Sequence, residues 1–336
     1  MSAIHPLTGT RLSRPSPASW LLAAGLGVAA IAVLAWLAHP HQLAESLDDV
    51  SPRYLLLALA LNVPLVLVRA LRARTVVGRL GHHPPLLRMV PVQLLGQTSS
   101  SLSPAASGDL LRAYLWRRHE GVPVPDGVAV VLFERILGLL LLLAAAATLP
   151  LLLRLPSPAS LAAAAGVLLM PPLALRAGTW LPESLERSLL GRLDGLPVVG
   201  GLARQVLAAL GLLRLLAGSP GLVARATVLT LLGFTVSGLQ VWLLVTGIGF
   251  GIPIDMAIGS SAASEVGGIL STLPFGLGSA DAILVTLFAG YGVTVTLAAT
   301  VAVLLRAVTT VPQALAGLAA YAMVQKGSTE AEFEVQ

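Results

Sequence analysis

The sequence predicts an all-α polytopic membrane protein with about six full spans and two oppositely oriented re-entrant helical hairpins arranged as an inverted repeat. Of the 336 residues, 56% are apolar and only 11% are charged, whereas soluble domains are usually about 25% charged. Runs of about 20 nearly uncharged residues recur along the chain, which is the length that a helix needs to cross a bilayer. Two apolar stretches are interrupted by short polar segments rich in Ser, Pro and Gly. These three observations carry the prediction.

The distribution of arginine orients the predicted spans. Lys and Arg in short loops favour the cytoplasmic side of a membrane. Basic residues mark both the leader (residues 1–16) and the loop that follows the second span, whereas the loop 39–52 has three acids and no base. We therefore expect a multi-pass protein of the cytoplasmic (inner) membrane with both termini in the cytoplasm. The six full spans are expected over residues 20–38, 53–71, 128–149, 161–175, 227–248 and 297–323.

The first polar interruption, residues 99–112, predicts a hairpin that enters and leaves the membrane on the cytoplasmic side. The apolar stretch before it, 86–102, has basic residues on both flanks and is too short to span twice. Pro104 and Gly108 are expected to form the turn. A polar backbone of this kind cannot face lipid, so it should lie against protein or a hydrated cavity. Ser101 and Ser103 would then offer hydroxyl groups to a polar ligand.

A second interruption, residues 271–281, has the opposite charge environment. There is no Lys or Arg between residues 249 and 295, so this hairpin is expected to enter from the outside. Its turn is predicted at Pro274, Gly276 and Gly278.

The two interruptions share a skeleton, which predicts an internal repeat. In each copy a proline precedes a glycine by four residues, at Pro104 and at Pro274. In each copy an arginine inside an apolar span, Arg135 or Arg306, follows a Gly-Val pair by 14 residues counted from the glycine. Because the charge flanks are opposite, the two copies should be inverted, as in many transporters. The expected organisation is a single membrane domain (17–325) containing repeat 1 (53–149), a cytoplasmic amphipathic connector (181–222) and repeat 2 (226–323), followed by a disordered acidic tail (326–336).

Seven charged residues fall within or beside the predicted membrane segments. A charge at the bilayer centre costs at least about 2.5–3.5 kcal/mol, so each should be paired or lie in a hydrated cavity. One interpretation is that they are ion pairs that lock helices together. The other is an anion site, in which the planar fork of arginine binds phosphate oxygens and the carboxylates orient the arginines. The candidates are Asp109, Arg112, Glu134, Arg135, Glu265, Asp281 and Arg306.

These residues give the chain a resemblance to a known family. The relevant motifs are, in order, Leu102-Ser-Pro with Gly108-Asp109 and Arg112, then Glu134-Arg135, then Leu273-Pro-x-Gly-x-Gly278 with Asp281, and then Arg306. This pattern resembles the transmembrane region of lysylphosphatidylglycerol synthases. This flippase-like family includes the membrane half of the multiple peptide resistance factor. The resemblance covers about residues 50–325. It implies a stand-alone membrane component, without the aminoacyltransferase domain, that binds or moves a polar lipid.

The leading functional hypothesis is therefore a flippase-like translocase rather than an enzyme. Its substrate would be a polar or anionic membrane lipid, either a phospholipid or a polyprenyl-phosphate-linked lipid. The sequence has no Gly-x-x-x-x-Gly-Lys-Ser/Thr stretch, so ATP is not expected to drive it. No cofactor, metal or nucleic acid is expected, and a second copy of the chain or a separate lipid-modifying enzyme would be compatible partners.

Two alternatives are open. One is an intramembrane lipid-linked glycosyltransferase-type enzyme, in which Asp48 and Asp49 in the loop 39–52 would act as base or metal ligands. The other is an ion-coupled transporter of a small soluble anion.

Overall fold

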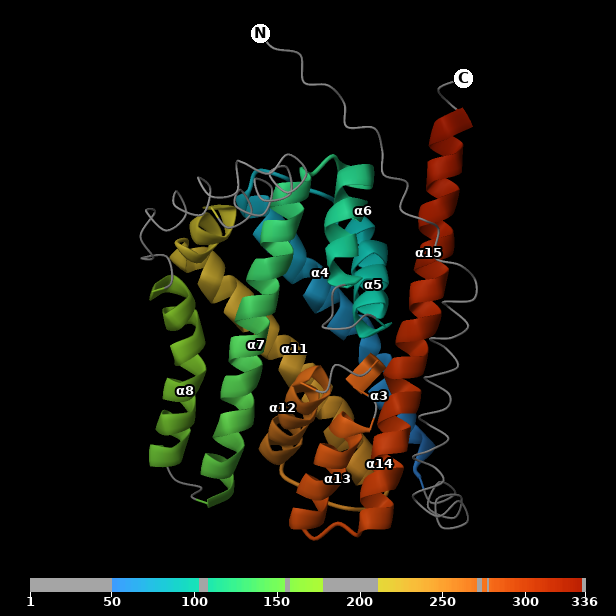
Figure 1. Ribbon diagram of the computed structural model, residues 1–336. Coiled ribbons are helices and arrows are strands. Elements are labelled where there is room, and N and C mark those ends of the chain that lie inside the picture. The colour runs from blue at the N-terminus through green and yellow to red at the C-terminus, as the bar shows by residue number, and fades with distance from the viewer. Residues whose placement is uncertain are drawn as a thin grey trace.

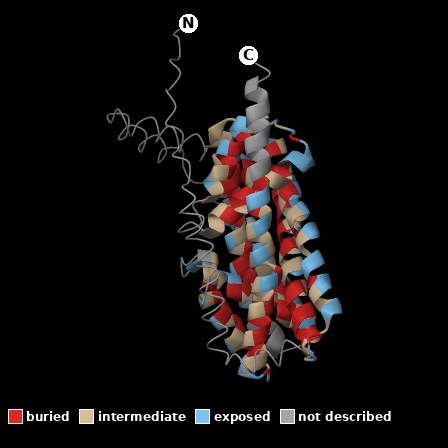
Figure 2. Ribbon diagram, turned by 90° about the vertical axis from the view of Figure 1, so that its right-hand side faces the viewer, coloured by how far each residue is buried: buried red, intermediate tan, exposed pale blue. Residues whose placement is uncertain are grey.

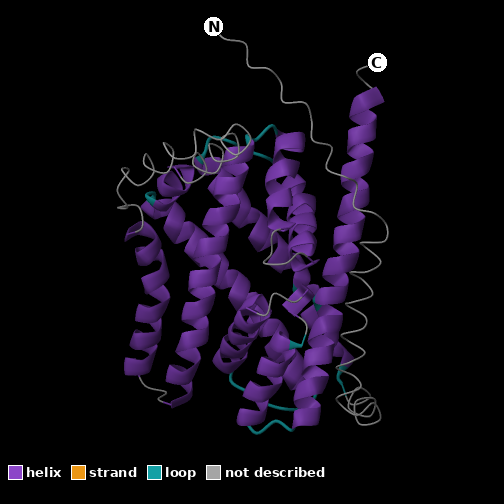
Figure 3. Ribbon diagram, in the orientation of Figure 1, coloured by secondary structure: helices purple, strands orange, loops and turns teal. Residues whose placement is uncertain are grey.

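The computed structural model describes residues 50–102, 108–154, 158–177, 211–270, 274–276 and 278–333. Every regular element in these ranges is helical (Figure 1, Figure 3). The expected leader and first span, and most of the expected connector, lie outside the described residues. The helices are α3 (Pro52–Ala60), α4 (Asn62–Arg79), α5 (Leu86–Leu102), α6 (Leu110–Glu120), α7 (Val124–Arg154), α8 (Pro158–Ala177), α11 (Pro220–Gly247), α12 (Ile254–Leu270), the 3-10 turn η3 (Pro274–Gly276), α13 (Ser279–Gly290), α14 (Val295–Val308) and α15 (Thr310–Phe333).

Four helical stretches in the described residues are long and apolar enough to cross a membrane, and α8 contains a shorter apolar stretch, Ala162–Arg176. Each of the five lies over one of the expected spans, so the class of all-α polytopic membrane protein is confirmed. Many large apolar side chains point outward, as is required of a surface that contacts lipid. The four long stretches are Pro52–Arg79, Val124–Thr148, Pro220–Gly247 and Val295–Tyr321.

Two of these stretches are broken near their middle in the same way. α3 ends at Ala60 and α4 begins at Asn62, while α14 ends at Val308 and α15 begins at Thr310. In both cases the third residue of the second helix is a proline, Pro64 or Pro312. A proline has no N–H to donate and its ring clashes with the preceding turn, which breaks a helix.

Side-chain amides replace hydrogen bonds at these breaks and join them. The Asn62 amide donates to the backbone oxygen of Leu59 at 2.8 Å and to that of Val308, in the other broken stretch, at 2.6 Å. The buried Gln240 amide on α11 donates to the Ala58 oxygen at 3.0 Å. The carbonyl groups are thus satisfied within the protein, as a membrane interior requires.

Two helical pairs lie toward opposite ends of the bundle. α5 and α6 occupy the upper half of Figure 1, the half in which α15 ends, and α12 and α13 occupy the lower half. α5 packs on α4 and α15, and α6 packs on α7; α12 packs on α7 and α11, and α13 packs on α14. Each pair is therefore held between longer helices, and the ends where the two members of a pair are joined point toward the middle of the bundle.

The apolar core is divided in the same way. One cluster gathers around α4, α5, α6 and α7 and includes Trp116 and Phe133; a second gathers around α11, α13 and α14 and includes Phe288 and Leu284. Figure 2 shows the buried residues on the interior faces of the helices. Each helical pair thus has its own apolar support.

One local expectation differs from the structure. α15 is helical through Phe333, so residues 326–333 of the expected disordered tail continue the helix; the Lys, Glu and Ala residues in this segment are good helix formers. α8 is continuous through Pro171 and Pro172.

The contact between α15 and α5 depends on Gly317. A Cβ at Gly317 would lie 2.3 Å from Thr98 Oγ1, so we expect Gly317→Ala to cost about 1–3 kcal/mol through overpacking. Gly166→Ala on α8 is the matched control, because a Cβ there meets nothing within 4 Å and the substitution favours the helix. Thermal unfolding of the purified protein, followed by tryptophan fluorescence, should show a lower Tm for Gly317→Ala alone. Equal Tm values would contradict the close packing.

Candidate functional site

A buried carboxylate joins three helices, α4, α6 and α7. Glu134 on α7 is only 3% exposed. Its Oε1 accepts a hydrogen bond from Arg72 Nε on α4 at 2.9 Å, and its Oε2 accepts one from Arg112 Nη2 on α6 at 2.8 Å. Arg72 Nη1 also donates to Thr230 Oγ1 on α11 at 3.1 Å. Glu134 thus connects the α5–α6 pair to the long helices.

Arg112 uses its guanidinium in several directions at once. Besides Glu134, it donates from Nη1 to Gln93 Oε1 on α5 at 2.7 Å. Its Nε lies 3.5 Å from Asp109 Oδ1, and its guanidinium carbon lies 5.5 Å from the centre of the Trp116 ring. Arg112 is 2% exposed, and its partners lie on both members of the helical pair and on α7.

A glycine makes room for this arginine. A Cβ at Gly96 would lie 2.1 Å from Arg112 Cγ. The side chain of Arg112 therefore passes across α5 where there is no side chain.

Asp109 extends the chain of opposite charges. It stands at the N-cap position of α6, but its carboxylate does not cap the helix. Instead its Oδ2 accepts from Arg135 Nε at 2.5 Å, and Arg135 Nη2 donates to Ser100 Oγ on α5. The side chain of Arg135 is 36% exposed, which makes it the most accessible of these ion-paired side chains.

A compact version of the same pairing joins α14 to the start of α13. Arg306 on α14 donates from Nε to Asp281 Oδ1 at 2.9 Å and from Nη2 to Asp281 Oδ2 at 3.0 Å. Its Nη1 donates to the backbone oxygen of Phe275 at 2.7 Å. All three nitrogens of this guanidinium are engaged, and Asp281 also accepts from Gly278 N at 3.0 Å. This favours an ion-pair lock for Arg306 in this conformation.

The turn at residues 274–278 needs glycine for two reasons. Gly276 and Gly278 both have positive φ, 62° and 83°, which glycine adopts without steric cost. A Cβ at Gly276 would also lie 2.7 Å from Gly268 Cα on α12. Phe275 shares the positive φ, at 56°, and its carbonyl is the one that Arg306 binds.

The two Asp–Arg pairs occupy equivalent places. Asp109 precedes Arg135 by 26 residues, and Asp281 precedes Arg306 by 25. In both cases the aspartate lies at the start of the second helix of a pair, and the arginine lies in a following helical stretch. The partner of each arginine could not be read from the sequence, because Glu134, next to Arg135, was an equally good candidate.

The charged residues that surround Glu134, namely Arg69, Arg72, Asp109, Arg112 and Arg135, form what we call the charged centre. Sequence reasoning missed Arg69 and Arg72, and it also missed Gln93, which binds Arg112. Arg72 was assigned to a loop because the apolar run ends at Leu71, but α4 continues to Arg79. The i, i+3 spacing of Arg69 and Arg72 in an apolar helix was the available signal, because such residues share a helix face.

Arg69 differs from the other arginines of the centre. It is partly buried on α4, and it interacts electrostatically with Glu265, Arg72, Asp109 and Arg112. Within the described residues it makes no hydrogen bond or ion pair, and neither does the exposed Glu265 on α12. The centre thus contains one cation and one anion that are near each other without direct contact.

The remaining predicted residues lie around the first turn. Ser101 accepts a hydrogen bond from Gln313 Nε2 on α15 at 3.1 Å. Gly108 begins the short turn that leads into α6, while Ser103 and Pro104 lie outside the described residues. Among the residues that the structure describes, no three His, Asp or Glu side chains converge as metal ligands.

The fold and the charged centre define a polytopic helical membrane protein in which two helical pairs are locked to long helices by buried ion pairs. The model of one family, described as "Lysylphosphatidylglycerol synthase TM region", matches residues 21–317. The chain therefore belongs to this family, and the resemblance inferred from its motifs is confirmed. Membership makes it a membrane protein related to lipid handling.

One curated relative is similar over a shorter segment. It is "Glycosyltransferase AglD" from Haloferax volcanii, 28% identical over 115 residues. The aligned segment is 34% of this chain and only 18% of the length of that protein.

The central position of Glu134 has a direct consequence for stability. Glu134→Gln removes the charge that compensates two arginines, and breaking a buried pair in this way costs about 3–5 kcal/mol. Glu265→Gln is the matched control, since Glu265 is exposed and makes no ion pair among the described residues; an exposed substitution usually changes stability by about 0.5 kcal/mol or less. Thermal unfolding of the two purified variants in the same detergent compares these effects. A Tm for Glu134→Gln as high as that of the control would refute the role of Glu134.

Proposed function

We propose that the chain is a flippase-like translocase that binds a polar or anionic lipid and moves it across the cytoplasmic membrane without ATP, and that it is not an enzyme. One observation carries the proposal. In a centre whose other arginines are engaged, Arg69 is left without a direct partner beside an exposed carboxylate, Glu265. A buried charge without a direct partner is costly in the membrane, and the phosphate of a headgroup would pair with it.

The charge balance of the centre supports an anionic ligand. Arg69, Arg72, Arg112 and Arg135 face only three carboxylates, those of Asp109, Glu134 and Glu265, so one positive charge is in excess. Arginine presents a planar fork that matches phosphate oxygens. Glu265 would then accept hydrogen bonds from the polar or cationic part of the same headgroup.

The engaged residues have a different role in this proposal. Arg112, Glu134, Asp281 and Arg306 position the helical pairs, while Arg69 contacts the ligand and Arg135, which is partly exposed, borders it. Ser101 and the turn near Gly108 would supply further polar groups at the entrance.

The mechanism that we infer is alternating access between inverted repeats. The pairs α5–α6 and α12–α13 would be re-entrant hairpins that enter from the cytoplasm and from the outside. Their placement toward opposite ends of the bundle (Figure 1) and the equivalent Asp–Arg pairs support this. Two similar halves give two conformations of similar energy, each open to one side. A second copy of the chain or a separate lipid-modifying enzyme would be compatible partners.

One observation favours a second candidate. The similarity to Glycosyltransferase AglD supports a role in handling the lipid-linked substrate of such an enzyme, with or without sugar transfer. Transport of a small soluble anion is the remaining alternative, and it would use the same Arg69.

The proposal predicts that Arg69→Gln impairs lipid movement without unfolding the protein. Losing a charge-assisted hydrogen bond costs about 1.5–3 kcal/mol, so transfer should slow about tenfold or more. The full chain is reconstituted in vesicles with fluorescent phosphatidylglycerol, and dithionite quenching reports the rate. Arg53→Gln, an exposed arginine on α3, is the control.

Three results would count against the proposal. Equal rates for Arg69→Gln and wild type would remove Arg69 from the pathway. Uptake of glycerol phosphate in place of lipid movement would indicate the small-anion transporter. Release of sugar from a lipid-linked donor would indicate the enzyme.

The inverted topology predicts opposite accessibility of two exposed sites. Leu87, at the start of α5, is 80% exposed, and Val295, at the start of α14, is 63% exposed. The chain has no cysteine, so Leu87→Cys and Val295→Cys each introduce a single thiol. An impermeant maleimide added to intact cells should label only Val295→Cys, and permeabilised cells should show both. Labelling of both from outside would contradict the topology.

A further inference from the structure

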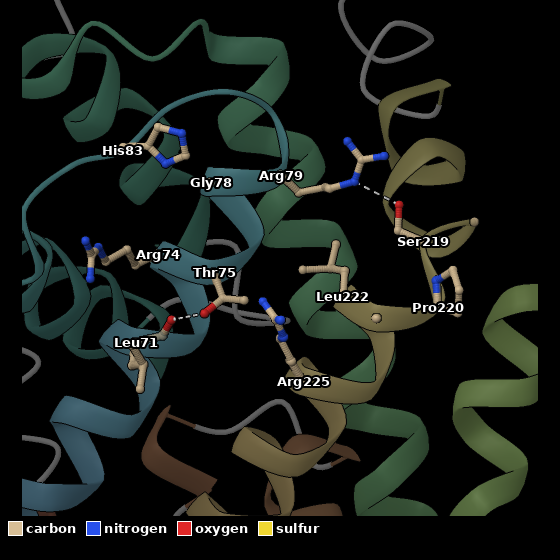
Figure 4. Close-up of a pocket in the computed structure, with 12 residues that line it drawn as sticks. Leu71, Arg74, Thr75, Gly78, Arg79, His83, Ser219, Pro220, Leu222 and Arg225 are labelled. Carbon is tan, nitrogen blue, oxygen red and sulfur yellow. Dashed lines mark hydrogen bonds between the residues drawn. The ribbon is translucent and has the colours of Figure 1, made fainter.

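A basic cavity lies between the end of α4 and the start of α11 (Figure 4). Its volume is about 770 Å³. Three arginines line it, Arg74 and Arg79 from α4 and Arg225 from α11, and His83 follows α4. Among the described residues that line it there is no carboxylate. The cavity is therefore strongly positive, unlike the charged centre around Glu134.

The arginines keep donors available for a ligand. Arg79 Nε donates to Ser219 Oγ at 3.0 Å, and Arg74 Nε donates to the Pro84 oxygen at 3.2 Å. The terminal nitrogens of both arginines make no hydrogen bond or ion pair within the described residues. Arg225 makes no hydrogen bond or ion pair within the part of the chain that the structure describes. Figure 4 shows its side chain rising between the two helices.

The start of α11 adds little side-chain bulk to the cavity. A Cβ at Gly221 would meet nothing within 4 Å. No side chain caps α11, so the N–H groups of Gly221 and Leu222 are also available at the cavity. They add to the arginines, which carry the charge.

An apolar groove continues from this cavity. A second hollow of about 420 Å³ shares Leu71, Thr75 and Arg225 with the first. It adds Ala224, Val228 and Leu229, further along the membrane-crossing stretch of α11. Val228 is 64% exposed, so the groove opens to the surroundings of the helix bundle.

This site is distinct from the charged centre. Leu71, Arg74, Thr75 and Gly78 recur at helical spacing and share one face of α4. Arg72 lies on an adjoining face, from which it reaches Glu134.

We propose that the cavity and groove together bind one anionic phospholipid of the membrane, with its phosphate among Arg74, Arg79 and Arg225 and an acyl chain along Leu71 and Val228. The charge of the cavity matches a phosphate, for which arginine is well suited. The groove is apolar and lies on two membrane-crossing stretches, which fits an acyl chain rather than a peptide or a nucleotide. Basic pockets between membrane helices on the cytoplasmic side bind anionic headgroups, and the arginines place this end of α4 on that side. The site does not depend on lipid movement through the centre.

Native mass spectrometry of the full chain tests this, with phosphatidylglycerol titrated against phosphatidylcholine. We expect wild type to retain one phosphatidylglycerol in preference to phosphatidylcholine. Arg225→Gln should bind it about tenfold more weakly, which corresponds to a loss of about 1.4 kcal/mol of binding free energy. Val228→Trp should weaken the binding of long-chain phosphatidylglycerol, because the larger side chain fills the groove. Arg117→Gln, an exposed arginine at the end of α6, should bind as wild type does.

Each other outcome would overturn the proposal. Equal retention of both lipids would contradict the proposal. An equal loss of phosphatidylglycerol binding in Arg225→Gln and Arg117→Gln would show that the cavity arginines only set the orientation of the protein in the membrane. Displacement of the lipid by inorganic phosphate, with Val228→Trp unaffected, would assign the site to a soluble anion.

Discussion

Glu134 is the constraint on which the rest of the structure depends. A carboxylate buried in a membrane protein must be compensated, and here two arginines from α4 and α6 compensate it. The same contacts fix the α5–α6 pair against α7. Arg112 can reach Glu134 only because Gly96 leaves space. Ser100, Ser101 and Asp109, which belong to the polar interruption, also hydrogen-bond to other helices of the protein.

The ion pair between α13 and α14 achieves the same compensation with fewer groups. Asp281 and Arg306 form a two-point ion pair, and the backbone oxygen of Phe275 also accepts from the arginine. The centre around Glu134 needs more residues and contains the cation without a direct partner, Arg69. This asymmetry suits a protein in which both halves share a scaffold while one of them meets the ligand, as we propose.

Much of the fold could be predicted from the sequence, because membrane crossing imposes a strong pattern of length and charge. The long helices and the family follow from apolar runs and from motifs such as Glu134-Arg135. The pairing within the centre could not be predicted. Neighbouring residues on a helix point in different directions, so Glu134 and Arg135 take different partners. Arg72 was missed because the expected span ended with the apolar run at Leu71, whereas the helix continues to Arg79.

A double-mutant cycle between Arg112 and Glu134 tests the central constraint most directly. Arg112→Leu, Glu134→Leu and the double variant are compared with wild type by equilibrium unfolding in the same detergent. Removing one partner leaves the buried charge of the other uncompensated, whereas removing both leaves only Arg72, which is less buried, without its carboxylate. The double variant should therefore lose less stability than the two single variants together, with a coupling of about 0.5–3 kcal/mol. Additive losses would show that the two residues act independently and would contradict the account.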